Sequence, residues 1–448
     1  MKPIRRALVA ALALAPALAF QAARADTYPT HPIKLVVTDD LRRSRPRVVF
    51  TLLLAIPHFI WLFLWSLLMI VVAIANWVAA LATGRPAGGL HRLTCSYIRY
   101  LTHVNAYVDL VANPYPAFTG EEGKYPIDVR LPEPAPQVRW KTFFRLFLAV
   151  PALLMASALG GAGTGFGSRG GRSRYYGVGA RGALSATCAF LGWFASLARG
   201  RMPKGLRDAS AYSLGYTAQW LAYLLLVTDR YPDADPTAML DGVGRPPEHE
   251  VRLVGYADDL RFSRVTVFFR LLLALPHLVW LALWTVAVVV TTIANWFVTL
   301  FRGTPAQSLH SFASRYVRYQ LHVYSFLFLA ANPFPGFDGA PGRYPLDLQL
   351  PGPARQNRWK TGFRIVLAVP ALLVNSAVGY GLYAAAFLTW FVALVRGSAP
   401  WGLRNFSAYA LRYQAQADAY LLLLTDAYPH ASPLEGAASP QHEFAEAA

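Results

Sequence analysis

Charged residues are scarce in this sequence. They make up 15% of the 448 residues, whereas 55% are hydrophobic and the mean hydropathy is +0.32. Apart from one histidine each in the first two, the stretches 48–83, 271–301 and 365–395 contain no ionisable Asp, Glu, Lys, Arg or His. An ordinary soluble domain of this length carries more charge. Uncharged runs longer than about 18 residues predict helices embedded in a membrane.

Acidic residues are rarer than basic ones. The chain has 24 Asp and Glu against 42 Lys and Arg, which gives a net charge of +18. The arginines flank the apolar runs and do not gather in a polar domain, and no signature of a nucleic-acid-binding module is present. The pattern therefore predicts a lipid bilayer with anionic phospholipid headgroups as the partner, and no nucleic acid.

Cysteine is almost missing, since only Cys95 and Cys188 occur and they form no CxxC spacing. A disulfide framework is thus excluded. Three pairs of histidines recur along the chain, but a zinc site needs three or four converging ligands. The sequence also lacks the GxSxG, HExxH and P-loop motifs. We therefore expect no metal, no cofactor, no catalytic residues and no enzymatic activity.

What the sequence does contain is one unit repeated four times. An offset of 94 residues carries the third unit onto the fourth, for example Pro276 onto Pro370 and Trp296 onto Trp390. An offset of 219 carries the first unit onto the third. Such a repeat has to be recognised before any fold is assigned. It indicates that a unit was duplicated to a pair and that the pair was duplicated again.

The repeat sets the expected domain boundaries. Unit two carries an insertion of 22 residues near 160–182, which contains four arginines. The predicted segments are a signal-peptide-like or anchor segment at 1–25, unit one at 32–116, unit two at 125–232, a linker at 233–248, unit three at 249–335, unit four at 343–429 and a polar tail at 430–448.

Each unit is expected to begin with a short strand, because aliphatic and polar residues nearly alternate there. These segments are 32–37, 126–131, 250–254 and 345–350. An apolar span follows. A helix of 31 residues is about 46 Å long, whereas a hydrocarbon core is about 30 Å thick. The insertion falls within the span of unit two, and a charged loop does not sit in hydrocarbon. We therefore predict that each span is a hairpin of two short helices, with a single tilted helix as the alternative.

A third helix closes each unit. In unit three Arg315, Arg318 and His322 share one helix face, and Arg99 and His103 repeat it in unit one. Basic residues on one side and aromatic residues on the other are typical of an amphipathic helix in the membrane interface. A helix packed in the bundle, with its arginines reaching to the surface, is the alternative. The predicted headgroup contacts are Arg99, His103, Arg315, Arg318, His322 and Arg412.

Several motifs together resemble a known family. The strings 268–277 (FFRLLLALPH), 296–297 (WF), 302–303 (RG) and 420–429 (YLLLLTDAYP) are similar to the bacterial domain of unknown function 4389 family. The resemblance covers about 32–429 as four copies. It implies a bacterial, multi-pass protein of the inner (cell) membrane and no established activity. Unit one departs from the pattern at Thr51, where the other units have arginine.

The expected fold class is an α-helical integral membrane protein of four tandem units, each with a short β-strand, an apolar helical hairpin and an amphipathic interfacial helix. The expected function is a non-enzymatic scaffold that contacts anionic lipid, a membrane-protein partner or further copies of itself. A transporter or channel built from repeats is the alternative, although no charged residue interrupts the spans outside the insertion. A lipid-modifying enzyme is a third class.

Overall fold

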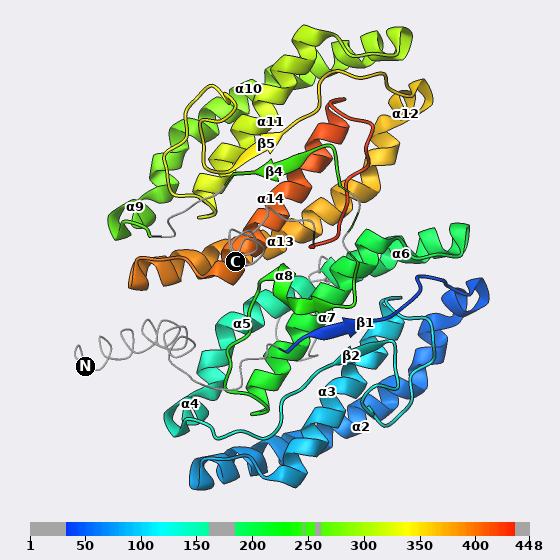
Figure 1. Cartoon of the computed structure of the whole chain (residues 1–448), viewed down its shortest axis with the longest axis vertical. Helices are drawn as coiled ribbons and strands as arrows, with labels where there is room; N and C mark the ends of the chain where they lie inside the picture. Colours follow the sequence, from blue (N-terminus) through cyan, green and yellow to red (C-terminus); the bar gives the residue numbers. More distant parts are fainter. Residues whose placement is uncertain (1–32, 161–183, 245, 247, 256–260, 435–448) are drawn as a thin grey trace, which may run out of the picture. The chain divides into compact units, whose positions relative to one another are not determined.

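The computed structural model describes residues 33–160, 184–244, 246, 248–255 and 261–434 (Figure 1). The chain forms two compact halves, which divide between residues 244 and 245. The first half contains units one and two, and the second contains units three and four. The signal-peptide-like segment 1–25 and nearly all of the insertion in unit two lie outside the described residues.

Each half contains long helices and short strands. The first half is built from β1 (Leu35–Val37), α2 (Arg45–Thr83), α3 (Gly88–Val108), β2 (Ile127–Val129), α4 (Arg139–Phe143), α5 (Arg145–Gly160), α6 (Leu184–Arg199), α7 (Lys204–Leu224), α8 (Pro236–Met239) and β3 (Leu240–Asp241). The second half is built from β4 (Arg252–Val254), α9 (Arg264–Phe268), α10 (Arg270–Arg302), α11 (Gln307–Leu327), β5 (Asp347–Gln349), α12 (Arg358–Gly362), α13 (Arg364–Arg396) and α14 (Trp401–Leu421).

The predicted hairpin of the apolar span is wrong in units one, three and four. There the span is one continuous helix, namely α2, α10 and α13. Gly379 and Gly381 lie near the middle of α13 and do not interrupt it. An isolated glycine costs a helix only about 1 kcal/mol, which the surrounding apolar helix formers outweigh. Within the described residues, α2, α10 and α13 are long and apolar enough to cross a membrane.

The third helix of each unit lies in the middle of its half. In the first half α3 and α7 lie between α2 on one margin and α4–α6 on the other (Figure 1). In the second half α11 and α14 lie between α10 and α13 in the same way. About half of the residues of α3 and α11, and most of those of α7 and α14, are buried. The helices are thus packed among the other helices of their half, as in the alternative, and strands and loops cover the basic face of α3 and α11. Their position at a membrane interface stays a prediction.

The four predicted strands are confirmed. β1 pairs antiparallel with β2, with Leu35 opposite Val129. β4 pairs antiparallel with β5, with Leu253 opposite Leu348. In both sheets the strand of the odd unit thus pairs with the strand of the even unit. The linker adds β3, which pairs parallel with β1.

The two units of a half exchange contacts at both ends of their long helices. Trp77 Nε1, late in α2, donates to Thr142 O at 2.9 Å, and Trp193 Nε1, late in α6, donates to Val48 O at 3.0 Å. The second half repeats these bonds, from Trp296 to the Thr361 carbonyl and from Trp390 to the Val267 carbonyl. Each unit therefore contacts the start of the apolar span of the other, in the first turns of α2 or in the short helices α4, α9 and α12.

Candidate functional site

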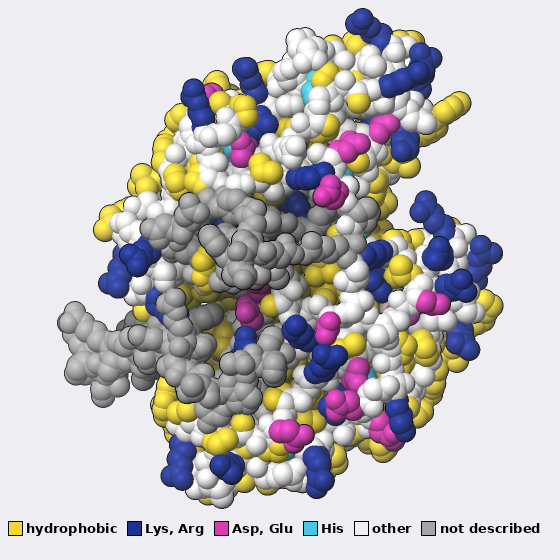
Figure 2. Space-filling view, viewed as in Figure 1, with side chains coloured by type: hydrophobic (Ala, Val, Ile, Leu, Met, Phe, Trp, Pro, Cys, Tyr) yellow, Lys and Arg dark blue, Asp and Glu magenta, His cyan; other side chains and the backbone are white. Residues whose placement is uncertain are grey.

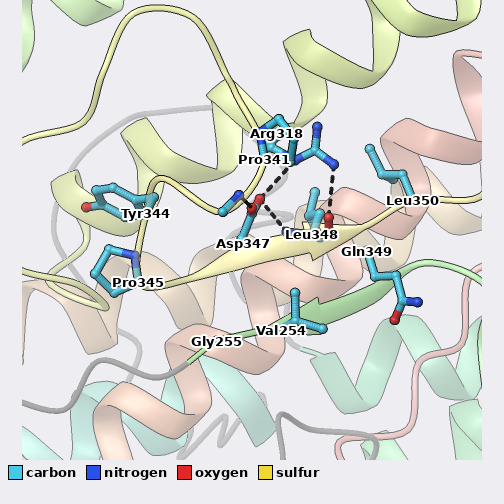
Figure 3. A pocket seen from close by; sticks show the side chains of 11 residues that line it. Val254, Gly255, Arg318, Pro341, Tyr344, Pro345, Asp347, Leu348, Gln349 and Leu350 are labelled. Carbon is cyan, nitrogen blue, oxygen red and sulfur yellow. Dashed lines mark hydrogen bonds and ion pairs between the residues drawn. The ribbon is translucent and has the colours of Figure 1, made fainter.

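Strand β5 and helix α11 meet at a cluster of ionisable groups (Figure 3). Asp347 Oδ1 lies 2.9 Å from Arg318 Nε and 3.3 Å from His322 Nε2. The same oxygen accepts a hydrogen bond from Leu348 N at 2.7 Å, and Oδ2 accepts one from Gly342 N at 2.6 Å. Arg318 Nη2 in turn donates to the Leu348 carbonyl at 3.1 Å. The carboxylate therefore joins the central helix, the strand and the loop before the strand.

The surroundings of Asp347 favour its charged form. Burial by itself would raise the pKa of this carboxyl group, but the hydrogen bonds from His322, Gly342 and Leu348 and the charge of Arg318 outweigh it. The pKa of Asp347 is lowered as a result, so the group is a carboxylate at neutral pH. His322 is also fixed from its other side, since its ring stacks on Tyr344 with 4.8 Å between the ring centres.

The first half carries the same cluster at the equivalent positions. Asp128 Oδ1 on β2 lies 3.4 Å from His103 Nε2 and 3.9 Å from Arg99 Nε on α3. Gly123 N and Val129 N donate to the carboxylate at 2.5 and 2.7 Å. Burial opposes ionisation here too, but the contacts with His103, Gly123 and Val129 lower the pKa of Asp128. The cluster is therefore part of the repeat of two units.

The even units use a neutral side chain at the position of these histidines. Gln219 Nε2 on α7 donates to Ile33 O at 2.9 Å, and Gln416 Nε2 on α14 donates to Val251 O at 3.1 Å. Each glutamine thus attaches its helix to the backbone leading into the neighbouring strand, β1 or β4. Each central helix (α3, α7, α11 or α14) is thus fixed to the strand layer, which is formed by β1, β2 and β3 in the first half and by β4 and β5 in the second. The odd units use an ion cluster for this contact, and the even units use a glutamine amide.

A shallow pocket opens over the cluster of the second half. Arg318 and Asp347 line it together with Tyr344 and the end of β4 at Val254 and Gly255 (Figure 3). The carboxylate accepts hydrogen bonds from three protein groups and is ion-paired with Arg318, so it is engaged in holding the fold. The arrangement is suited to fastening the strand layer to the helix layer, and the guanidinium of Arg318 forms part of the pocket wall.

The six residues predicted to contact lipid headgroups are placed differently from one another. Arg315 is exposed. Arg412 is 2% exposed, and its Nη2 donates to the Ser432 carbonyl at 2.5 Å. The members of the set that are partly or fully buried with protein partners are Arg99, His103, Arg318, His322 and Arg412. A headgroup contact at these five stays a prediction, and each has a protein partner that competes with lipid.

The remaining recurrent histidines are buried as well. His58 Nδ1 on α2 lies 2.6 Å from the Tyr100 hydroxyl, and its ring stacks on Phe118 with 4.4 Å between the centres. His277 and Tyr319 repeat the contact at 2.8 Å. In the part of the chain that the structure describes, no three His, Cys, Asp or Glu side chains come together as a metal-binding group.

Sequence reasoning missed Asp128 and Asp347. A signal was present, since both lie 25 residues after the recurrent histidine, at His103 and His322, and both occupy the middle of the predicted strand. Only the packing of the strand on the helix shows that the acid and the histidine of each pair meet.

The fold and these clusters define a class, a duplicated pair of units in which long apolar helices frame two central helices under a strand layer. The chain belongs to the family described as Domain of unknown function (DUF4389). The family model matches residues 45–120, 179–234, 264–337 and 358–432, which is more than half of the chain and confirms the four copies. No curated protein and no solved structure matches the chain.

Replacing Asp347 by asparagine is expected to destabilise the second half. The change leaves Arg318 and His322 without their anion, and breaking a buried ion pair costs about 3 kcal/mol. In a half of this size the midpoint of thermal unfolding should fall by about 6–12 °C. The measurement is a thermal-shift assay of the protein in detergent. The matched control is Asp338→Asn in the same loop, whose pair with Arg343 is exposed and should change the midpoint by no more than about 2 °C.

The wild type and the Asp347→Asn variant can also be compared as a function of pH. Because the pKa of Asp347 is lowered in the folded state, its stabilising contribution is present above the usual carboxyl pKa of about 4. It is lost as the pH falls through the lowered pKa. The stability difference between the wild type and Asp347→Asn should therefore be constant near neutral pH and shrink below about pH 4. A difference that is unchanged down to pH 3 would show that the carboxylate charge does not matter.

Proposed function

We propose that this protein is a non-enzymatic scaffold of the bacterial cell membrane. Its long apolar helices are embedded in lipid, and anionic headgroups bind the arginines at the ends of the apolar spans. The strand layer is the surface that binds a membrane partner. The observation that carries the proposal is the outward exposure of the long helices. Only 22% of the most apolar 18-residue window is buried in α2 and in α10, and 39% in α13.

The exposed surface of these helices is apolar along their whole length. In α2 the exposed side chains include Phe50, Leu53, Phe63 and Val71, which are 52%, 61%, 64% and 65% exposed. Soluble monomers rarely expose a continuous apolar surface larger than a few hundred Å². A bilayer supplies the apolar solvent that these side chains need, which supports a membrane-embedded protein.

An exposed arginine lies where the apolar span of each unit starts, at the first residue of α2, α4, α9 or α12. Each of them donates to a carbonyl in the last turn of the helix that ends the apolar span of the other unit in the same half, namely α6, α2, α13 or α10. The pairs are Arg45 with Ala198, Arg139 with Ala82, Arg264 with Val395 and Arg358 with Phe301, at 2.9–3.2 Å. A cation at a helix C-terminus is favourable, and the exposed guanidinium has further donors for a phosphate.

Aromatic side chains accompany these arginines. Trp140 follows Arg139 and is 43% exposed, and Trp359 follows Arg358 and is 79% exposed. Trp next to Arg or Lys is typical of the boundary between hydrocarbon and headgroups. We propose that anionic lipid binds at these arginine and tryptophan residues. They are not among the six headgroup contacts predicted from the sequence.

The expected result is a loss of bound anionic lipid when the helix ends lose their charge. The variant with Arg45, Arg139, Arg264 and Arg358 all changed to glutamine should retain less phosphatidylglycerol, measured by native mass spectrometry of the protein from mixed micelles. Each basic residue near an anionic surface contributes about 1 kcal/mol, or about a fivefold change in affinity.

The control removes the same charge from the strand layer. It changes four exposed basic residues, namely Lys124, Arg130, Arg252 and Arg343, to glutamine. This variant should keep its lipid. Equal loss from both variants would reduce the effect to net charge. Release of the wild-type protein from membranes by sodium carbonate at pH 11 would overturn the proposal that it is membrane-embedded.

A further inference from the structure

A loop with exposed charged residues packs against each of the helices α2 and α10. The position of this contact along the helix limits how the helix can lie in a bilayer. In the first half of the chain His58 and Trp61 lie between the first third and the middle of α2. Both contact the loop before β2, since the ring of His58 stacks on Phe118 and Trp61 Nε1 donates to the Phe118 carbonyl at 3.2 Å. The same loop carries Glu122, which pairs with Arg99 at 2.6 Å and is 64% exposed. The loop that packs on this part of α2 therefore carries an exposed charge.

The second half repeats this arrangement. Trp280, near the first third of α10, donates to the Phe337 carbonyl at 3.2 Å, and the ring of His277 stacks on Phe337 with 4.1 Å between the centres. The adjoining residues Asp338 and Arg343 form an exposed pair. Figure 2 shows Lys, Arg, Asp and Glu side chains spread over this face of each half, with apolar side chains along the margins.

A helix that crosses the bilayer does not fit this arrangement. With 39 residues α2 is about 58 Å long, and a hydrocarbon core of about 30 Å would contain it only at a tilt of about 60° from the membrane normal. Helices in known structures tilt by about 0–40°. A smaller tilt that puts the middle of α2 in the hydrocarbon also puts Glu122 and its irregular loop there, which is strongly unfavourable.

Crossing with only one end of α2 does not remove the conflict. The N-terminal part exposes Leu52 and Leu53, and the C-terminal part exposes Ile70, Val71 and Ile74, each to 56% or more — wherever one part crosses, the other leaves its apolar side chains in water. A helix parallel to the membrane plane immerses both parts at once and keeps the charged layer on the side of the headgroups.

We propose that each half lies in one leaflet of the bilayer, with its long helices parallel to the membrane plane and its strand layer at the aqueous surface. The proposal rests on the proposed function, because it requires a membrane-embedded protein, and it replaces the multi-pass crossing expected from the sequence. The partner of the apolar face is the acyl-chain region of a single leaflet. The arginine and tryptophan residues at the helix ends then lie at headgroup level.

The test is whether the two ends of one long helix lie on the same side of the membrane. Single cysteines are placed at Ser44 and Arg85, which flank α2, in the full-length chain with Cys95 and Cys188 changed to alanine. An impermeant maleimide is added to spheroplasts before and after lysis. Lys124→Cys reports the side of the strand layer. The expected result is that all three positions react under the same condition.

The second half is tested with Ser263→Cys, just before α9, and Arg302→Cys, at the last residue of α10, with Arg343→Cys for the strand layer. Phe63→Cys and Leu283→Cys, in the middle of α2 and α10, are 64% and 61% exposed in the fold. They should react only after detergent is added, since lipid covers them. Reaction of these two in intact or lysed cells would show that the helices lie in water and would overturn the inference.

The outcomes separate this inference from the proposed function. Reaction of the two ends of α2 or α10 under opposite conditions, in protein that carbonate does not release, overturns the one-leaflet arrangement and leaves the membrane scaffold in place. Release by carbonate, as expected if a second copy of the chain covers the apolar helices in solution, overturns both.

Discussion

Replacing Arg364 by glutamine is expected to destabilise the second half more than any other single change at one side chain. Arg364 is 1% exposed. Its Nη1 donates to the carbonyls of Tyr420 and Thr425 at 3.1 and 2.9 Å, and its Nη2 donates to Gln356 Oε1 at 2.8 Å and to Asp426 Oδ1 at 2.6 Å. The guanidinium also lies 4.4 Å above the ring of Tyr420. One side chain thus joins the beginning of α13 to the end of α14.

The loss should be about 3–5 kcal/mol, because breaking a buried ion pair leaves its partner without a counter-charge. That corresponds to a fall of about 6–20 °C in the midpoint of thermal unfolding of a half of this size. Thermal-shift and trypsin-resistance measurements in detergent should agree. Asp426→Asn, which removes the other member of the pair, is expected to have an effect of the same sign and smaller size, since Asp426 is partly exposed.

The chain offers two matched controls for Arg364. Arg358→Gln removes an exposed arginine from the neighbouring short helix and should change the midpoint little. The double change of Arg364 to threonine and Asp426 to asparagine copies unit one, which has Thr51 and Asn113 at these places. It should recover part of the stability, because no charge is then left unpaired. A double variant as unstable as Arg364→Gln would show that packing of the arginine matters more than its charge.

A single repeat unit is expected not to fold. In the second half Trp296 Nε1 donates to the Thr361 carbonyl at 2.7 Å, and Trp390 Nε1 donates to the Val267 carbonyl at 3.1 Å. Strand β4 of unit three has β5 of unit four as its partner. Unit three alone would therefore have an unpaired strand and two long helix ends without their partners, and isolated strands and small cores are marginal at best.

The comparison is between residues 249–434 and residues 249–342, purified in the same detergent. The longer chain should give a cooperative thermal transition and a trypsin-resistant core, and the shorter one should give neither. If the shorter chain unfolds cooperatively at a similar temperature, the contacts between units are not needed for folding. A transition in neither chain would show that the whole protein is the folding unit.

Local sequence patterns predicted the repeat, the strands and the apolar spans, because each of these features depends on residues close together in the chain. Strand 32–37 is an example, since alternation alone predicts the segment that contains β1. The prediction of a helical hairpin was wrong for units one, three and four, because it extended a local feature of unit two to the other units. Its evidence, the insertion in unit two, comes from one copy, and the uninterrupted apolar residues of α2, α10 and α13 continue the helix in the others.

Four copies of one apolar unit, with basic residues at the ends of their spans, can be recognised from the amino-acid sequence. Which side chains meet follows only from the three-dimensional packing of the two units of a half. The sequence predicts that Arg318 and His322 contact lipid headgroups. In the fold their partner is Asp347, which lies on a strand of the next unit. Nothing local encodes such a contact. A buried cation needs an anion, and the fold of two units together brings one to it.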